Sequence, residues 1–174
     1  MHHTHHTVNH AELLTSVLDS SLDGILALSA VRSDPGEIVD FRFDVVNCAA
    51  EQITGRSASE LIGGRLLDIF PGNRADGLFD AYVQAVETGE PFSTEHHYTH
   101  DGLNHWFTIK ATKYGDGLTI TFSDITARKA TEKELNKLSM VASRTDNGVV
   151  ITNSRGRVEW ANHAFTQITG YSLE

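Results

Sequence analysis

The segment TFSDITARKATEKELNKLSMVA, residues 121–142, changes midway from a strand pattern to a helix pattern, with no glycine or proline in between. Residues 118–123 alternate large apolar side chains with hydroxyl side chains, a period of two that predicts a half-buried strand. The tripeptide DIT at 124–126 follows, and its Asp or Thr side chain can accept hydrogen bonds from the free amides of a helix start. Good helix formers, most of them charged, continue from residue 127. We therefore expect a strand that runs directly into an exposed helix.

The apolar side chains of this expected helix form a narrow stripe, since Ile125, Leu135, Leu138 and Ala142 lie roughly on one face. Such a stripe is too thin for a core helix and suits a helix that pairs with a partner helix. Residues 11–20 show a second, shorter amphipathic pattern near the start of the chain. The two flanking helices predict a homodimer, whose candidate contact residues are Leu13, Leu14, Val17, Leu135 and Leu138.

The composition excludes several classes of protein. The chain has 174 residues, 40% of them hydrophobic, which is enough for a packed core. A net charge of −9 argues against nucleic acid and against an anionic membrane as partners. The single cysteine, Cys48, permits no intrachain disulfide, and no apolar run or signal peptide points to a membrane or to secretion. We expect a cytoplasmic protein.

The remaining patterns come in blocks of strands and helices. Two strand patterns flank a DPG turn, several short helices follow, and three more strands come last, with a DG hairpin signal at 101–102. Strands at both ends with helices between them predict an α+β domain with one antiparallel sheet. The expected helices are 11–20, 47–54 and 73–88, with short helical pieces at 57–62 and 66–70, and the expected strands are 25–31, 38–46, 92–100, 103–114 and 118–122.

The end of the chain repeats an earlier part. NCAAEQITGRSAS at 47–59 aligns with NHAFTQITGYSLE at 162–174, and Asn, Ala, Gln, Ile, Thr, Gly and Ser recur in step. Upstream, DGIL at 23–26 pairs loosely with DNGV at 146–149. Because an internal repeat takes precedence in a fold prediction, residues from about 144 are expected to begin a second, incomplete copy of the same domain.

These motifs together resemble the PAS domain family of bacterial signalling proteins. The resemblance rests on N-x-A-x-x-x-I-T-G, present twice, on S-x-x-E-L-I-G at 57–63, and on D-I-T-x-R-K at 124–129. It implies a five-stranded antiparallel sheet with helices on one face, a small internal cavity, and an exit helix that often forms a parallel dimer. The expected divisions are a tag-like or disordered start at 1–10, a PAS domain at 11–126, a linker helix at 127–143, and a truncated second PAS domain at 144–174.

The resemblance also implies a function. PAS domains usually precede a histidine kinase, a cyclic-dinucleotide enzyme or another PAS domain. We expect a sensory input module that relays a ligand, redox or dimer-state signal to the following helix. The expected relay residues are Asp124, Ile125 and Thr126.

The cofactor stays open at this level, since the family binds flavins, haem, small acids or nothing. Cysteinyl-flavin photochemistry is disfavoured because the segment at 64–69 carries no thiol where such photoreceptors have one, and Cys48 is interpreted as a small packing residue. Haem is disfavoured because residues 73–88 contain no histidine. A flavin, a fatty or aromatic molecule, or no ligand suits the apolar candidates for the pocket: Phe43, Ile53, Leu66, Ile69, Phe70, Leu78, Trp106, Ile109 and Phe122.

Histidines gather at two places, and neither predicts a metal site. His96, His97, His100 and His105 share one hairpin, where His96 and His100 face one side and His97 the other. A solvated hairpin explains them, and those near the tip can tune a surface with pH. The His-rich start resembles a purification tag, with metal capture as the alternative.

No catalytic motif is present. The chain lacks a phosphate-binding G-x-x-x-x-G-K loop and a G-x-S-x-G elbow, so these residues are not expected to form an enzyme. Two functions remain, a sensory input module and a ligand-free dimerisation or docking module.

Overall fold

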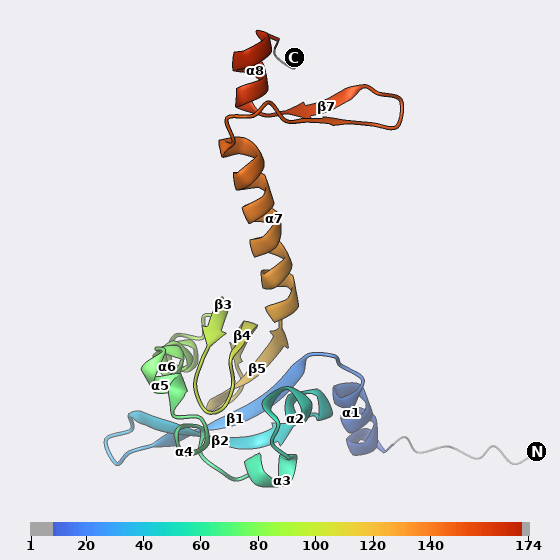
Figure 1. Cartoon of the computed structure of the whole chain (residues 1–174). Helices are drawn as coiled ribbons and strands as arrows, with labels where there is room; N and C mark the ends of the chain where they lie inside the picture. The colour runs from blue at the N-terminus through green and yellow to red at the C-terminus, as the bar shows by residue number, and fades with distance from the viewer. Residues whose placement is uncertain (1–8, 172–174) are drawn as a thin grey trace, which may run out of the picture. The chain divides into compact units, whose positions relative to one another are not determined.

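A computed structural model describes residues 9–171 and divides the chain into two compact units, one ending at Thr126 and one beginning at Ala127. The tag-like start falls largely on residues 1–8, outside the described residues, as do residues 172–174. The first unit contains one five-stranded antiparallel sheet, which confirms the expected α+β fold (Figure 1). Its strands are β1 (Gly24–Arg32), β2 (Ile38–Val46), β3 (Phe92–Tyr98), β4 (His105–Lys113) and β5 (Gly117–Asp124), in the spatial order β2-β1-β5-β4-β3.

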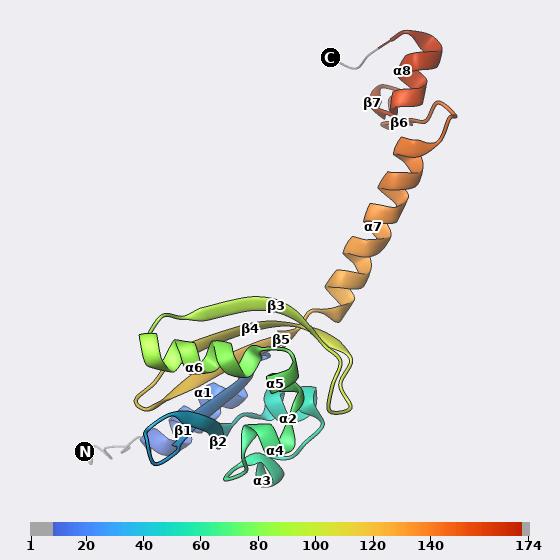
Figure 2. The same cartoon turned by 90° about the vertical axis from the view of Figure 1, so that its left-hand side faces the viewer.

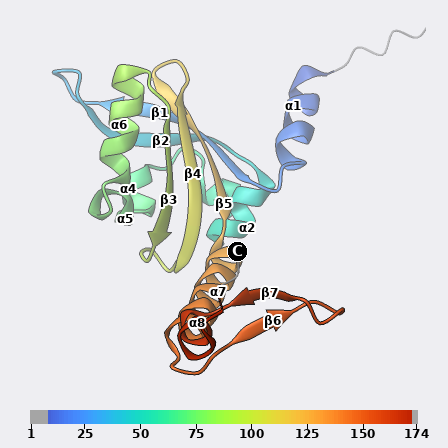
Figure 3. The same cartoon turned by 90° about the horizontal axis from the view of Figure 1, so that it is seen from above.

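The helices between β2 and β3 cover one face of the sheet (Figure 2). The apolar sides of β1, β2, β4 and β5 meet these helices in one hydrophobic core. The first helix, α1, lies beside α2 and away from α6 (Figure 3). The helices are α1 (His10–Asp19), α2 (Cys48–Thr54), α3 (Ala58–Leu61), α4 (Leu66–Ile69), α5 (Gly72–Ala75) and α6 (Leu78–Thr88).

The helix expected over residues 73–88 is interrupted, which corrects the sequence prediction. The chain forms the short helix α5, then a turn through Asp76 and Gly77, and only then α6. Gly77 has φ +75°, a left-handed conformation that glycine adopts without steric cost and that a continuing α-helix does not allow. The interruption places Asn73 and Leu78 on the same core cavity from two different helices.

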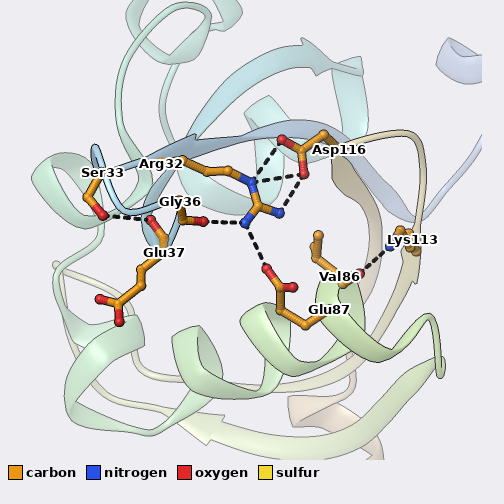
Figure 4. A network of polar contacts seen from close by, with 8 residues as sticks. All are labelled: Arg32, Ser33, Gly36, Glu37, Val86, Glu87, Lys113 and Asp116. Atoms are coloured by element: carbon orange, nitrogen blue, oxygen red, sulfur yellow. Dashed lines mark hydrogen bonds and ion pairs between the residues drawn. The ribbon is translucent and has the colours of Figure 1, made fainter.

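A charged network fastens the end of α6 to the sheet (Figure 4). The Arg32 guanidinium donates to the Asp116 carboxylate, with Nη2 2.7 Å from Oδ1, and Nη1 lies 2.9 Å from Glu87 Oε1. Arg32 Nη1 also donates to the carbonyl oxygen of Gly36 at 2.6 Å. One side chain thereby joins the β1–β2 hairpin, the β4–β5 turn and the last turn of α6. These bonds and charges raise the pKa of Arg32 further above its ordinary range, so the side chain stays charged.

The second unit repeats the opening of the first on a smaller scale. Helix α7 (Thr126–Arg144) leads to β6 (Val150–Thr152), which pairs antiparallel with β7 (Val158–Ala161), and α8 (His163–Thr169) follows. Gly170 ends α8 in a left-handed conformation, with φ +74°, as Gly55 ends α2 with φ +68°. The local structure therefore repeats where the sequence repeats.

Candidate functional site

The core of the first unit contains a small, partly open cavity of about 80 Å³ between the sheet and the helices. Its lining is almost wholly apolar, as expected for a pocket that holds an apolar ligand or none. Six of the residues proposed from the sequence line it: Phe43, Leu66, Phe70, Leu78, Ile109 and Phe122.

Three of the proposed residues lie elsewhere. Ile53 and Ile69 are partly buried against the core but do not line the cavity. Trp106 lies on the opposite face of the sheet, where its ring stacks on His97 with centroids 5.0 Å apart. Because side chains alternate along a strand, Trp106 and Ile109 cannot share a face, and the inward residue beside Trp106 is Phe107.

Several lining residues were not predicted from the sequence, although the alternation along two strands indicates some of them. Ile120 belongs to the same alternation as Phe122, and Phe107 to the alternation that contains Ile109. No local pattern marks the polar residues Asn73 and Tyr98, since they reach the cavity through tertiary packing. The lining residues beyond the prediction are Leu26, Thr54, Asn73, Tyr82, Tyr98, Leu103, Phe107 and Ile120.

The cavity has one polar corner. Tyr98 Oη donates to the Asp101 carboxylate, and Asn73 Nδ2 donates to Tyr98 Oη at 3.3 Å. The backbone amide of Gly72 donates to the same Asp101 carboxylate at 3.1 Å. Burial and the bond to Asp101 raise the pKa of the Tyr98 phenol well above its ordinary value, so it remains a hydroxyl. A ligand in the cavity would meet a mainly apolar wall and, at this corner, the polar groups of Tyr98 and Asn73.

A second polar cluster lies beside this corner. The Asp76 carboxylate is shared between two imidazoles, with Oδ2 2.8 Å from His96 Nε2 and Oδ1 2.9 Å from His100 Nε2. Burial acts to raise the pKa of Asp76, but the bonds and charges of the two histidines outweigh it and hold that pKa below its ordinary value. The hairpin histidines are thus more than a solvated surface. Within residues 9–171, no three His, Cys, Asp or Glu side chains are arranged to hold a metal ion.

The junction between β5 and α7 is fastened to the start of β4. The Trp106 backbone forms two hydrogen bonds with this junction. Ile125 N donates to the Trp106 carbonyl oxygen at 2.7 Å, and Thr126 Oγ1 accepts from Trp106 N at 2.9 Å. Asp124 Oδ1 accepts from Thr126 N at 2.8 Å, as a helix cap does. Two hydrogen bonds therefore attach the junction to β4, the strand beside β5.

Asp124 also faces His105, with Oδ2 2.8 Å from the imidazole Nδ1. Burial acts to raise the pKa of Asp124, while the bonds from Thr126 and the charge of His105 lower it by more, so the carboxyl stays ionised. His105 is a partner of Asp124 that the sequence did not indicate. On α7 itself, Arg128 Nη1 lies 2.9 Å from Glu132 Oε1.

The residues proposed as dimer contacts are exposed on both flanking helices. On α1, the exposed fractions of Leu13, Leu14 and Val17 are 50%, 63% and 58%. On α7, Leu135 and Leu138 are 61% and 59% exposed. Apolar side chains this exposed at helical spacing are available for a partner.

Cys48 is exposed, which corrects its interpretation as a packing residue. It opens α2 and borders a hollow of about 260 Å³ between α1, the end of β2 and α2, whose lining mixes apolar and polar side chains. The neighbouring Asp19 carboxylate raises the pKa of the Cys48 thiol, so the thiol is less reactive than an ordinary cysteine.

Two sequence profiles match the chain. One, described as the PAS fold, matches residues 39–130, which is more than half of the 174 residues, and another, described as a PAS domain, matches residues 136–174. The chain therefore belongs to the PAS domain family, and the resemblance inferred from its motifs is confirmed. Comparison with curated proteins gave no match. No helix within residues 9–171 is long and apolar enough to cross a membrane.

Solved structures show the same fold. An RNA-binding light-oxygen-voltage receptor matches with a TM-score of 0.54 at 19% identity, over 81% of this chain and 40% of the receptor chain. A PAS domain of a protein from Colwellia psychrerythraea matches with a TM-score of 0.49 at 22% identity, over 68% of this chain and 99% of that chain. The PAS domain of nitrogen regulation protein NR(II) from Vibrio parahaemolyticus has a TM-score of 0.48 at 15% identity, over 65% and 98% of the two chains.

Proposed function

We propose that this chain is the sensory input part of a cytoplasmic signalling protein, such as a histidine kinase or a cyclic-dinucleotide enzyme. Membership of the PAS family supports the sensory role. The relay is supported by the position of β5, which lines the cavity and also leads to α7. Ile120 and Phe122 of β5 line the cavity, and the same strand ends at Asp124, two residues before α7 begins. A shift of β5 would reach α7 through Asp124, Ile125 and Thr126.

The size of the cavity limits its ligand. About 80 Å³ is well below the roughly 300 Å³ at which pockets for drug-sized ligands begin. A flavin or a haem would require the helices to move outward, whereas a small apolar molecule of a few heavy atoms fits as the cavity stands. We propose such a small ligand, with Tyr98 and Asn73 as the groups that orient it.

The relay is tested by Asp124→Ala in the full-length signalling protein, with output activity as the readout. Loss of the cap and of the His105 contact should uncouple α7 from the sheet, so output should no longer respond to the signal. Asp80→Ala, an exposed aspartate of α6, is the matched control and should respond normally. Normal regulation in a folded Asp124→Ala protein would refute the relay.

A ligand-free dimerisation or docking module is the second candidate. The small cavity and the exposed apolar residues of α1 and α7 favour it. Absorbance and native mass spectrometry of the purified protein discriminate the two functions. Colour or an additional small mass would support ligand sensing, and a dimer without added mass, even after exposure to small apolar molecules, would favour docking.

A further inference from the structure

The connection between α5 and α6 is attached to the end of β3 by one carboxylate. Asp76 lies in this connection, His96 lies in β3, and His100 lies in the turn that follows, and the two Asp76–imidazole contacts measure 2.8 and 2.9 Å. The Asp76 side chain is 18% exposed and those of His96 and His100 are 25% and 38% exposed, so all three are half-buried and reachable by protons from solvent.

This cluster lies directly against the cavity wall. The Tyr98 ring stands between the two imidazoles, with centroids 6.4 Å from His96 and 5.6 Å from His100, and Tyr98 lines the cavity. Asn73 and Leu78, on either side of Asp76 in the sequence, line it as well. The approach is close, because a Cβ added at Gly72 would lie 2.3 Å from His100 Cβ. The contacts that hold Asp76 to β3 therefore also hold this wall of the cavity in place.

We propose that Asp76, His96 and His100 form a proton-sensitive latch that controls access to the core cavity. The inference rests on the proposed function only in taking the cavity as the place where a ligand acts. It adds a second input, pH, that sets how readily a ligand enters.

The charges favour a tighter latch when the histidines are protonated. Neutral imidazoles donate ordinary hydrogen bonds to Asp76, whereas protonated ones donate charge-assisted bonds that are roughly twice as strong. Asp101, bonded to Tyr98 beside the cluster, supplies a second carboxylate that offsets the second positive charge. The Tyr98 phenol, which contacts both imidazole rings, has a pKa that burial raises, so it stays neutral. We therefore assign the pH response of the latch to its imidazoles.

Xenon, an apolar atom that enters small protein cavities, is the probe. Its exchange with the cavity is measured by 129-xenon NMR at about pH 5.5 and about pH 8, two values between which an ordinary histidine changes charge. We expect exchange in the unmodified protein to be about five- to tenfold slower at the lower pH, from the added strength of the charge-assisted bonds. Asp76→Asn should exchange fast at both pH values. The double variant His96→Gln, His100→Gln keeps neutral donors and should also lose the pH dependence.

His97→Gln is the matched control, since His97 lies on the opposite face of the same strand and should leave the pH dependence intact. Circular dichroism confirms the fold of each variant, and the histidine double variant decides the test if Asp76→Asn is unfolded. Unchanged pH dependence in both the aspartate and the histidine variants would overturn the latch while leaving the proposed sensory function in place. Absence of xenon from the cavity at every pH and in every variant would refute access to the cavity, and with it both proposals.

Discussion

Asn47 and Asn162 show how a single buried residue organises each copy of the repeat. Asn47 Oδ1 accepts from the amides of Ile25 and Ala50, and its Nδ2 donates to the carbonyl oxygens of Leu18 and Asp23, at 2.8 to 3.0 Å. Asn47 is 1% exposed, so each of these backbone groups depends on it in place of water. It caps α2 and joins α1, β1 and α2 at one point. The sequence indicated only that a helix begins at this residue.

Replacing Asn47 with Ala should lower the free energy of unfolding by about 2–4 kcal/mol, because buried amides and carbonyls lose their partners. Urea denaturation followed by circular dichroism measures it. Gln52→Ala, an exposed substitution in the same helix, should change stability by less than about 0.5 kcal/mol. An equally small effect at Asn47 would contradict the assigned role.

Asp76 should make stability depend on pH in the acid range. Its pKa is lower in the folded protein than in the unfolded chain, so its contribution is present above the unfolded pKa and is lost as the pH falls through the folded one. Asp76→Asn should therefore be less stable than the unmodified protein at about pH 7, by about 1–2 kcal/mol. The difference should shrink below about pH 4. Urea denaturation across this pH range measures it, and a difference that grows on acidification would contradict the assignment.

At the scale of elements, the two strands that neighbour β5, β1 and β4, make different contacts. β1 pairs with one edge of β5 along the core, while β4 pairs with the other edge and continues to the junction, where His105 and Trp106 contact Asp124, Ile125 and Thr126. The start of α7 is thus attached to two strands, one by the covalent chain and one by side-chain and backbone bonds. This arrangement suits a helix that must follow movements of the sheet.

The Arg32 network should act on α6 as a unit. Arg32→Ala removes the link between the hairpin, the β4–β5 turn and the end of α6, so amides in the last turn of α6 should exchange faster with deuterium. Arg42→Ala is the control, because Arg42 is 55% exposed and forms an ion pair with Asp44 within one strand. Salt screens exposed pairs, so high salt should reduce the difference between Arg32→Ala and the unmodified protein. Unchanged exchange in α6 would show that the network does not hold the helix.

At the scale of the whole chain, α7 occurs in both copies of the repeat, at the end of the first and at the start of the second. It follows β5 of the first unit, and in the second unit Asn162 Nδ2 donates to the Ala142 carbonyl oxygen at 2.8 Å. Asn47 makes the same bond to Leu18 near the end of α1. Helix α7 therefore takes, in the second unit, the place that α1 has in the first. One helix is therefore shared by the two copies of the repeat, which is consistent with the proposed relay.

The exposed face of α7 leads to a prediction about assembly. Leu135→Glu with Leu138→Glu should shift a homodimer toward monomer by at least tenfold in dissociation constant, since charges would be buried in an apolar helix pair. Sedimentation equilibrium measures the shift. Asn136→Glu with Ser139→Glu adds the same charge at neighbouring exposed positions and should have a smaller effect. Equal effects of the two double variants would place the dimer contact elsewhere.

Local patterns predicted the elements well, because the signals are local. Ser57 and Glu60 form a capping box at the start of the short helix expected at 57–62. Asp101 and Gly102 both adopt positive φ in the expected hairpin turn. Local patterns failed where distant parts of the chain decide the outcome. A bulge between Ala27 and Leu28 shifts the pairing of β2, so that Val45 is 37% exposed although it alternates with Phe43.

The sequence by itself determined the family, the order of strands and helices, the repeat, and six of the cavity residues, because periodicity, caps and turns depend on neighbours in the chain. Only the tertiary structure decided which polar groups meet. Asp76 binds His96 and His100 across 20 and 24 residues, and His105 faces Asp124 from a neighbouring strand. Such partners are chosen by strand register and by a helix break at Gly77, and the distance between them in sequence leaves no local pattern.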